Sequence, residues 1–183
     1  MRVIAGSRRS MPLKAPTGLD TRPTQDRTKE TLFNVLQNNV PGCVFADLFS
    51  GSGGIGIEAL SRGAQKAYFI ENGRQAVACV RDNINFTRFN NEAVIMECDV
   101  LIGIEKLKCE KEIDIIFMDP PYDSGLEVNV LTKLAGMSYV TEYTIIVVES
   151  LLNADFSYLE DLGFEIYKVK QYKTNQHVFI RKQ

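Results

Sequence analysis

The feature that most constrains the fold is a regular alternation of short apolar runs with longer amphipathic stretches between residues 43 and 149. The apolar runs are rich in Val, Ile and Phe, which favour strands, whereas stretches such as 74–89 have helical spacing. A strand-helix-strand succession implies parallel strands joined by right-handed crossovers, with helices on both faces of one sheet. The sequence therefore predicts an open α/β sheet whose first five strands lie at 43–49, 66–71, 92–98, 113–118 and 143–149.

Both ends of the chain depart from this alternation. Residues 163–182 form two strand-like runs around 173–176 with no helix between them, which predicts an antiparallel hairpin at a sheet edge. Near the start, loosely alternating residues at 2–6 and 11–14 predict a short hairpin. Residues 24–40 have helical spacing and precede a Pro-Gly pair, so we expect a helix there.

The chain has 183 residues, enough for one domain to bury a core without metals or disulfides. We expect a single domain over 1–183, made of a basic N-terminal arm at 1–24 and an α/β core at 25–183. No apolar stretch approaches the length of a membrane span, and the N-terminus lacks the apolar run of a signal peptide. The sequence thus predicts a soluble, cytoplasmic protein with no membrane partner, and we expect a monomer.

The cysteines and the single histidine give no metal signal. The four cysteines are scattered without a C-x-x-C pair and adjoin apolar stretches, so buried, reduced thiols are predicted at Cys43, Cys79, Cys98 and Cys109. His177 has no cysteine or acid close to it in the sequence, which favours a buried strand histidine with a hydrogen-bond partner. No metal site is predicted.

The charge is unevenly distributed. The net charge is −2, but residues 1–30 carry +4 and the remainder carries −6. A basic arm on an acidic body is typical of a protein whose arm contacts a polyanion. A solvated terminus would show the same pattern, so charge alone leaves both interpretations open.

A glycine-rich loop follows the first predicted strand. In "DLFSGSGGIGIEAL", Gly51, Gly53 and Gly56 fit G-x-G-x-x-G and lead into a helix, so the backbone can approach a ligand closely and present free N–H groups. Glu71 ends the next predicted strand, where a carboxylate can accept hydrogen bonds from ribose hydroxyls. Together these features favour a nucleoside site over a simple turn.

Two ligand classes fit this loop. A nicotinamide or flavin dinucleotide would place its pyrophosphate at the helix N-terminus, whereas S-adenosylmethionine needs a carboxylate near its cationic methionine end. Asp47, at the end of the first strand, would supply that carboxylate or organise the loop as a cap. Asp99, after the third strand, would accept a hydrogen bond from an adenine amine or cap the following helix.

The stretch "DPPY" after the fourth strand separates these ligand classes. An exocyclic amine is a poor nucleophile because its lone pair is delocalised, and the Asp119 carboxylate and Pro120 carbonyl can accept its two hydrogens and orient the lone pair. Pro121 stiffens the turn, and Tyr122 can stack on an extruded base. The alternative is a rigid turn with an incidental acid.

With "RVIAGSRRSMPLKAP" and "TRPTQDRTKETLFNVL", these motifs resemble the RsmD-type family of class I S-adenosylmethionine-dependent methyltransferases over nearly the whole chain. The resemblance implies a mostly parallel seven-stranded Rossmann-like sheet and methylation of a guanine N2 amine in 16S rRNA of the small ribosomal subunit, position 966 in the family. It implies catalytic roles for Asp119, Pro120, Pro121 and Tyr122. The cofactor-binding set that it implies comprises Asp47, Ser50, Gly51, Gly53, Glu71 and Asp99. The expected RNA-binding residues are Arg2, Arg8, Arg9, Arg22 and Arg27.

Three other functions stay open from the residues alone. A DNA methyltransferase acting on adenine N6 or cytosine N4 would share the same catalytic residues, although such enzymes generally need an added segment to read base edges. A nicotinamide-dependent oxidoreductase would leave "DPPY" unexplained. A non-catalytic RNA-binding ribosome-assembly factor would retain the cofactor pocket as a scaffold.

Overall fold

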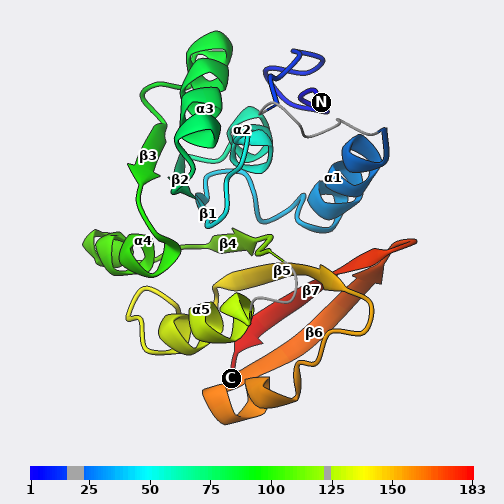
Figure 1. Cartoon of the computed structure of the whole chain (residues 1–183), viewed down its shortest axis with the longest axis vertical. Helices are drawn as coiled ribbons and strands as arrows, with labels where there is room; N and C mark the ends of the chain where they lie inside the picture. The colour runs from blue at the N-terminus through cyan, green and yellow to red at the C-terminus, as the bar shows by residue number, and fades with distance from the viewer. Residues whose placement is uncertain (16–22, 122–124) are drawn as a thin grey trace.

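A seven-stranded sheet forms the centre of the molecule in the computed structural model, which describes residues 1–15, 23–121 and 125–183 (Figure 1). The strand order is β3-β2-β1-β4-β5-β7-β6, with the first five strands parallel and β7 antiparallel to both of its neighbours. This arrangement confirms the predicted α/β sheet with a C-terminal hairpin. The strands are β1 Val44–Asp47, β2 Lys66–Glu71, β3 Ala93–Glu97, β4 Ile115–Met118, β5 Ile145–Leu151, β6 Phe164–Gln171 and β7 Asn175–Lys182.

Helices cover both faces of the sheet (Figure 1). One apolar core joins the sheet to α1, α2 and α3 and includes Phe33, Ile57 and Phe117. The other core joins it to α4 and α5 through side chains such as Ile104 and Leu131. The α-helices are α1 Pro23–Val35, α2 Gly54–Ser61, α3 Arg74–Thr87, α4 Val100–Lys106 and α5 Leu126–Ala135, and the 3₁₀ helices are η1 Leu107–Cys109 and η2 Ser157–Leu162.

The structure corrects two predictions of detail. Helix α1 ends at Val35, five residues before the predicted end, and Asn38 and Asn39 follow it in turns, as expected for residues that compete for backbone hydrogen bonds. All four cysteines are free thiols, and Cys43 and Cys79 are buried as predicted. Cys98 is only half-buried and Cys109 is exposed at the end of η1, so the predicted burial was wrong for Cys109 and held only in part for Cys98.

The order of the strands reverses between β1 and β4. After β1 the chain builds β2 and β3 on one side, then crosses to place β4 on the other side of β1. At such a reversal the connections leave the carboxyl ends of the two central strands in opposite directions, and ligands of α/β proteins bind in the space between them. Asp47 ends β1 and Asp119 directly follows β4, so both lie at this reversal.

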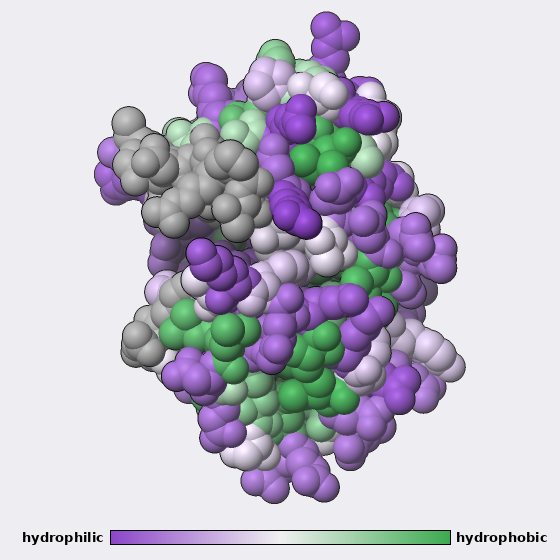
Figure 2. Space-filling view, turned by 90° about the vertical axis from the view of Figure 1, so that its right-hand side faces the viewer, coloured by the Kyte–Doolittle hydropathy of each residue, from purple (hydrophilic) through white to green (hydrophobic). Residues whose placement is uncertain are grey.

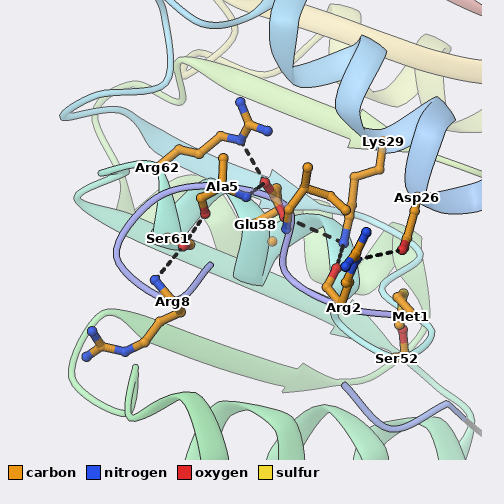
Figure 3. A network of polar contacts seen from close by, with 12 residues as sticks. Met1, Arg2, Ala5, Arg8, Asp26, Lys29, Ser52, Glu58, Ser61 and Arg62 are labelled. Carbon is orange, nitrogen blue, oxygen red and sulfur yellow. Dashed lines mark hydrogen bonds and ion pairs between the residues drawn. The ribbon is translucent and has the colours of Figure 1, made fainter. Parts of the chain in front are cut away.

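The N-terminal segment packs on the body through a buried acid on α2 (Figure 3). The carboxylate of Glu58 is fully buried and accepts hydrogen bonds from the backbone N–H groups of Ile4 (2.7 Å) and Ala5 (3.0 Å). It also pairs with Lys29 of α1 (3.5 Å) and with Arg62 (2.7 Å). One side chain therefore holds together the N-terminal segment, α1 and α2.

The N-terminal segment also forms the short hairpin that the sequence predicts. Arg2 and Pro12 make an antiparallel bridge, flanked by hydrogen bonds between the backbones of Val3 and Met11 (3.0 Å) and of Ser10 and Val3 (2.8 Å). The side chains of Val3 and Leu13 are buried in the same core as α1 and α2.

Hydrophobic side chains emerge on the outer strand of the C-terminal hairpin. Ile166, Tyr167 and Val169 of β6 are each about 42% exposed. Figure 2 shows the side of the molecule that lies at the right in Figure 1, with hydrophobic surface gathered in its lower half and surrounded by hydrophilic side chains. None of the helices in the described ranges is long and apolar enough to cross a membrane.

Candidate functional site

Three carboxylates line up at the carboxyl edge of the sheet. Asp47 of β1 is paired in register with Phe117 of β4, and Asp119 lies two residues beyond Phe117. Glu149 of β5 lies alongside Asp119, one residue beyond the last pair of the β4–β5 ladder. Because side chains alternate along a strand, the three acids share one face of the sheet. The acids predicted at 47 and 119 are therefore brought together, and a third joins them.

Asp47 is buried and only partly satisfied. Its side chain is 1% exposed, and Oδ2 accepts a hydrogen bond from the N–H of Gly56 in the first turn of α2 (3.3 Å). Oδ1 has no hydrogen-bond partner among the described residues. Burial raises the pKa of Asp47 to about 7, and the nearby charge of Glu71 adds to the rise. Asp47 thus organises the start of α2 and presents a free acceptor.

The glycine loop is shaped by backbone contacts at both of its ends. The hydroxyl of Ser50 donates to the carbonyl oxygens of Asp47 (3.0 Å) and Ile70 (3.2 Å), which fixes the loop between β1 and β2. Gly51 has φ +54° and faces open space, and Gly53 begins α2 with φ +79°. Both conformations favour glycine, and the space beside Gly51 leaves room for a ligand.

Glu71 connects the end of β2 to this loop. Its Oε2 accepts from the N–H of Gly51 (2.8 Å), and its Oε1 accepts from the N–H groups of Asn72 (3.0 Å) and Gly73 (2.8 Å). The structure therefore brings Glu71 and the glycine loop together, as the sequence predicts. The carboxylate also has a local role that the sequence did not indicate, because it supports the loop.

Asp99 is the N-cap of α4. Its Oδ1 accepts a hydrogen bond from the N–H of Leu101 (2.9 Å), and its side chain is exposed beyond the end of β3. The capping role is the one that the structure describes, and contact with an adenine stays a prediction.

Asp119 and the two prolines directly follow β4, beside the end of β1. More than a third of Asp119 is exposed, yet protein surrounds its carboxylate closely, and this loss of hydration raises its pKa to about 8, together with the charges of Glu149 and Asp47. Pro120 and Pro121 line a pocket of about 180 Å³ that Glu149 also lines. Tyr122 lies outside the described residues.

Sequence reasoning missed the groups that hold Glu149. Asn175 Nδ2 donates to Glu149 Oε1, and His177 Nε2 lies 3.1 Å from Oε2. The opposite nitrogen of His177 is 2.9 Å from the hydroxyl of Tyr172. His177 is 1% exposed on β7, which confirms a buried strand histidine with hydrogen-bond partners. Its acidic neighbour is on another strand, so no sequence signal near His177 revealed it.

The arginines predicted to contact RNA divide into two groups. Arg8 makes contacts within the protein, with its Nε 2.7 Å from the carbonyl oxygen of Thr87 and its guanidinium 5.1 Å from the centre of the Phe89 ring. Three others line one pocket of about 440 Å³ that also has acidic walls: Arg2, Arg9 and Arg27, with Asp26 and Glu30. Arg22 lies outside the described residues. Within the described ranges, no group of three or more His, Cys, Asp or Glu side chains is placed to hold a metal ion.

Comparison with known proteins gives matches over most of the chain. Residues 1–181 match the family model described as "Conserved hypothetical protein 95". "Putative rRNA methyltransferase YlbH" of Bacillus subtilis is 37% identical over 150 residues, which cover 81% of this chain and 82% of the relative. "Ribosomal RNA small subunit methyltransferase D" of Escherichia coli K12 is 33% identical over 150 residues, 82% of this chain and 74% of the relative. The solved structure titled "Putative methyltransferase yhhF from Escherichia coli" has a TM-score of 0.83 and 28% identity, covering 100% of this chain and 98% of that one.

Proposed function

This chain belongs to the family described as Conserved hypothetical protein 95, the RsmD family, and from that premise we propose that it transfers a methyl group from S-adenosylmethionine to the N2 amine of a guanine in 16S rRNA of the small ribosomal subunit. The family membership confirms the resemblance seen in the sequence, and the relatives' names and the fold support methyl transfer to ribosomal RNA. The observation that carries the proposal is that Asp47 and Asp119-Pro120 lie at the carboxyl ends of the two adjacent central strands, β1 and β4.

The residues around the glycine loop fit S-adenosylmethionine. The unpartnered oxygen of buried Asp47 would repel a pyrophosphate but attract the cationic methionine end of this cofactor. Open space at Gly51 leaves room for the ligand beside the backbone, and Glu71 would accept hydrogen bonds from the ribose hydroxyls. When bound, the cofactor supplies a methyl group activated by its sulfonium sulfur. Ser50 and Gly53 would shape the loop around it, and Asp99 would contact the adenine.

The acceptors that follow β4 account for the activation of the amine. We infer that the Asp119 carboxylate and the Pro120 carbonyl oxygen accept the two hydrogens of the amine, so that its lone pair points at the methyl carbon. With the cofactor bound, the nitrogen would bond to that carbon as the bond from the carbon to the sulfonium sulfur breaks, the neutral thioether product would leave, and the nitrogen would release one proton. Burial, together with the charges of Glu149 and Asp47, raises the pKa of Asp119, so its ionised form would accept this proton readily. Tyr122 would stack on the base.

The positive charges at the N-terminal end give the RNA a place to bind. Arg2, Arg9 and Arg27 share one pocket, so we infer that they contact RNA phosphates, whereas the carbonyl and ring contacts of Arg8 assign it mainly to holding the N-terminal segment on α3. A folded RNA with an exposed loop can be recognised by shape, which suits a chain of this size.

The test is transfer of labelled methyl from S-adenosylmethionine to small ribosomal subunits from cells that lack the activity, followed by nucleoside analysis. Duplex DNA and naked ribosomal RNA are assayed in parallel. We expect N2-methylguanosine from the subunits. Label in DNA would indicate a DNA amino-methyltransferase instead, and cofactor binding without label in any substrate would indicate a ribosome-assembly factor.

The Asp119→Ala variant tests the catalytic assignment in the same assay. We expect kcat to fall by about 10²–10³-fold, the range for loss of one preorganised transition-state contact. Cofactor affinity should change little, because Asp119 is assigned to the amine. Activity within about tenfold of the wild type would contradict the acceptor role of Asp119.

A further inference from the structure

Glu149 is a carboxylate that the proposed reaction leaves without a role. Asp119 and Glu149 follow Met118 and Val148, the last paired residues of β4 and β5, and the charge of Glu149 raises the pKa of Asp119, so the two carboxylates lie close together. Glu149 also lines a pocket together with Pro120 and Pro121. In the strand order, β5 lies on the opposite side of β4 from β1 and β2, which carry the glycine loop and Glu71. Glu149 is therefore farther from the proposed cofactor site than Asp119 is, on the side where the substrate base would lie. A side chain in this position meets the base that presents its amine to Asp119.

The side chains around Glu149 fix the direction of its carboxylate. Asn175 and His177, both on β7, each contact a different oxygen of Glu149, and Tyr172 contacts the far nitrogen of His177. Each carboxylate oxygen can accept two hydrogen bonds, and among the described residues each oxygen of Glu149 has one such side-chain partner, so each can accept a further hydrogen bond. The hairpin thus presents Glu149 as a preoriented acceptor.

Target bases differ at the ring atom next to the amine. Guanine carries an N1–H beside its N2 amine, so this edge offers donors only. Adenine and cytosine carry an unprotonated ring nitrogen beside their amine, which is an acceptor. A carboxylate facing that ring position attracts the N1–H of guanine and repels the lone pair of the other two bases.

We propose that Glu149 selects guanine at the methylation site by accepting the N1–H of the base whose N2 amine is held by Asp119 and Pro120. This inference rests on the proposed function and deepens it, because Asp119 and Pro120 alone would hold the amine of guanine, adenine or cytosine equally well. Asn175 and His177 act as positioning residues for Glu149.

The test uses small subunits assembled from 16S rRNA that carries either guanosine or 2-aminopurine riboside at the mapped target position. 2-Aminopurine keeps the N2 amine but has an unprotonated N1. The wild type should prefer guanosine by at least about 100-fold in kcat/KM, because the unprotonated N1 of 2-aminopurine cannot donate a hydrogen bond to the Glu149 carboxylate. Glu149→Gln, whose amide can donate to N1, should reduce this preference by at least about tenfold.

Two further variants keep the test decisive. Glu165→Gln, on the exposed strand β6, makes the same change of net charge and should leave the preference unaltered. Glu149→Asp retains a shorter carboxylate and should lower kcat/KM for guanosine while keeping the discrimination. An unchanged kcat/KM for guanosine in this variant would overturn the role of Glu149, even if Glu149→Gln does not fold. Calorimetric binding of S-adenosylmethionine reports whether each variant is folded.

The outcomes separate this inference from the proposed function. Failure of the wild type to methylate guanosine would overturn the proposed function and the inference with it. Methylation of guanosine with the same preference in the wild type and Glu149→Gln, within about threefold, would overturn the role of Glu149 alone. A collapse of the preference in Glu149→Gln but not in Glu165→Gln would support it.

Discussion

At the scale of single residues, the buried acid Asp47 combines a cost in stability with its proposed role in binding the cofactor. Folding raises its pKa from 3.8 to about 7, so the folded protein binds a proton that the unfolded chain has already lost. The contribution of Asp47 to the free energy of unfolding is therefore most favourable below about pH 4, and it falls as the pH rises through about 7. The unpaired Oδ1 is the part of the side chain that a cationic ligand would satisfy.

We predict that Asp47→Asn stabilises the cofactor-free protein at pH 8 and weakens its binding of S-adenosylmethionine. The amide has no charge to bury at high pH, so its stability advantage should shrink towards pH 5, where the wild-type acid is mostly protonated. Thermal unfolding of both proteins from pH 5 to pH 8 measures this difference, and calorimetry measures cofactor binding. A stability difference that does not vary with pH would contradict the burial of a titrating Asp47.

The same scale shows what a single sequence reveals about side chains. Gly51, Gly53, Glu71 and Asp119 were predictable because glycine spacing and strand ends are local features of the chain. The hydrogen bonds around Glu149 were not, since its contacts come from a neighbouring strand more than twenty residues away. Their formation depends on the β5–β7 register, which no local pattern reports.

At the scale of elements, α2 joins the glycine loop to the N-terminal segment through Glu58. We predict that Glu58→Ala lowers the free energy of unfolding by about 3–5 kcal/mol, because Lys29 would stay buried without its acidic partner. Burial lowers the pKa of Lys29, and Glu58 opposes that shift, so removal of the acid should lower this pKa further. Urea denaturation measures the loss of stability.

The control for this variant is Glu105→Ala, which removes an exposed carboxylate paired with Lys108 and Lys133. It should unfold close to the wild type, as exposed pairs contribute little. Hydrogen exchange gives a local readout, since the amides of Ile4 and Ala5 should lose protection in Glu58→Ala only. Unchanged protection there would show that Glu58 does not hold the segment.

The elements themselves were largely predictable. Buried parallel strands appear as continuous apolar runs, so β1 to β5 were placed to within two residues of their observed bounds. The end of α1 was not, because Leu36 and Val40 continue the apolar spacing although the chain there forms turns. In that segment, packing against the sheet preserves the buried positions after the helix has ended.

At the scale of the whole molecule, the proposed function requires an acidic body to bind a polyanion, and we propose that the positive charges of the N-terminal end supply the attraction. We predict that Arg9→Ala/Arg27→Ala lowers the affinity for small-subunit RNA and reduces the slope of log K against log salt by about 1.4–1.8, the value for two lost phosphate contacts. Binding titrations between low and physiological salt measure the slope.

A matched variant separates local contacts from net charge. Lys106→Ala/Lys111→Ala removes two exposed positive charges between the end of α4 and the start of β4, away from the carboxyl edge of the sheet. Its slope should equal that of the wild type. Equal slopes in both double variants would mean that Arg9 and Arg27 stay in contact with solvent and do not bind RNA phosphates.

The anchor at Glu58 sets limits on how this scaffold can be redesigned. A graft that replaces residues 1–30 to change the RNA preference would also replace Lys29 and the backbone amides that Glu58 binds. A graft without equivalent donors would leave the buried carboxylate of Glu58, on the helix that follows the glycine loop, without these hydrogen-bond and ion-pair partners. Under the proposed function, a change of substrate range through residues 1–30 would also disturb the helix at the cofactor site. Libraries that aim to vary the substrate should therefore keep the amides of Ile4 and Ala5, Lys29 and Glu58 together.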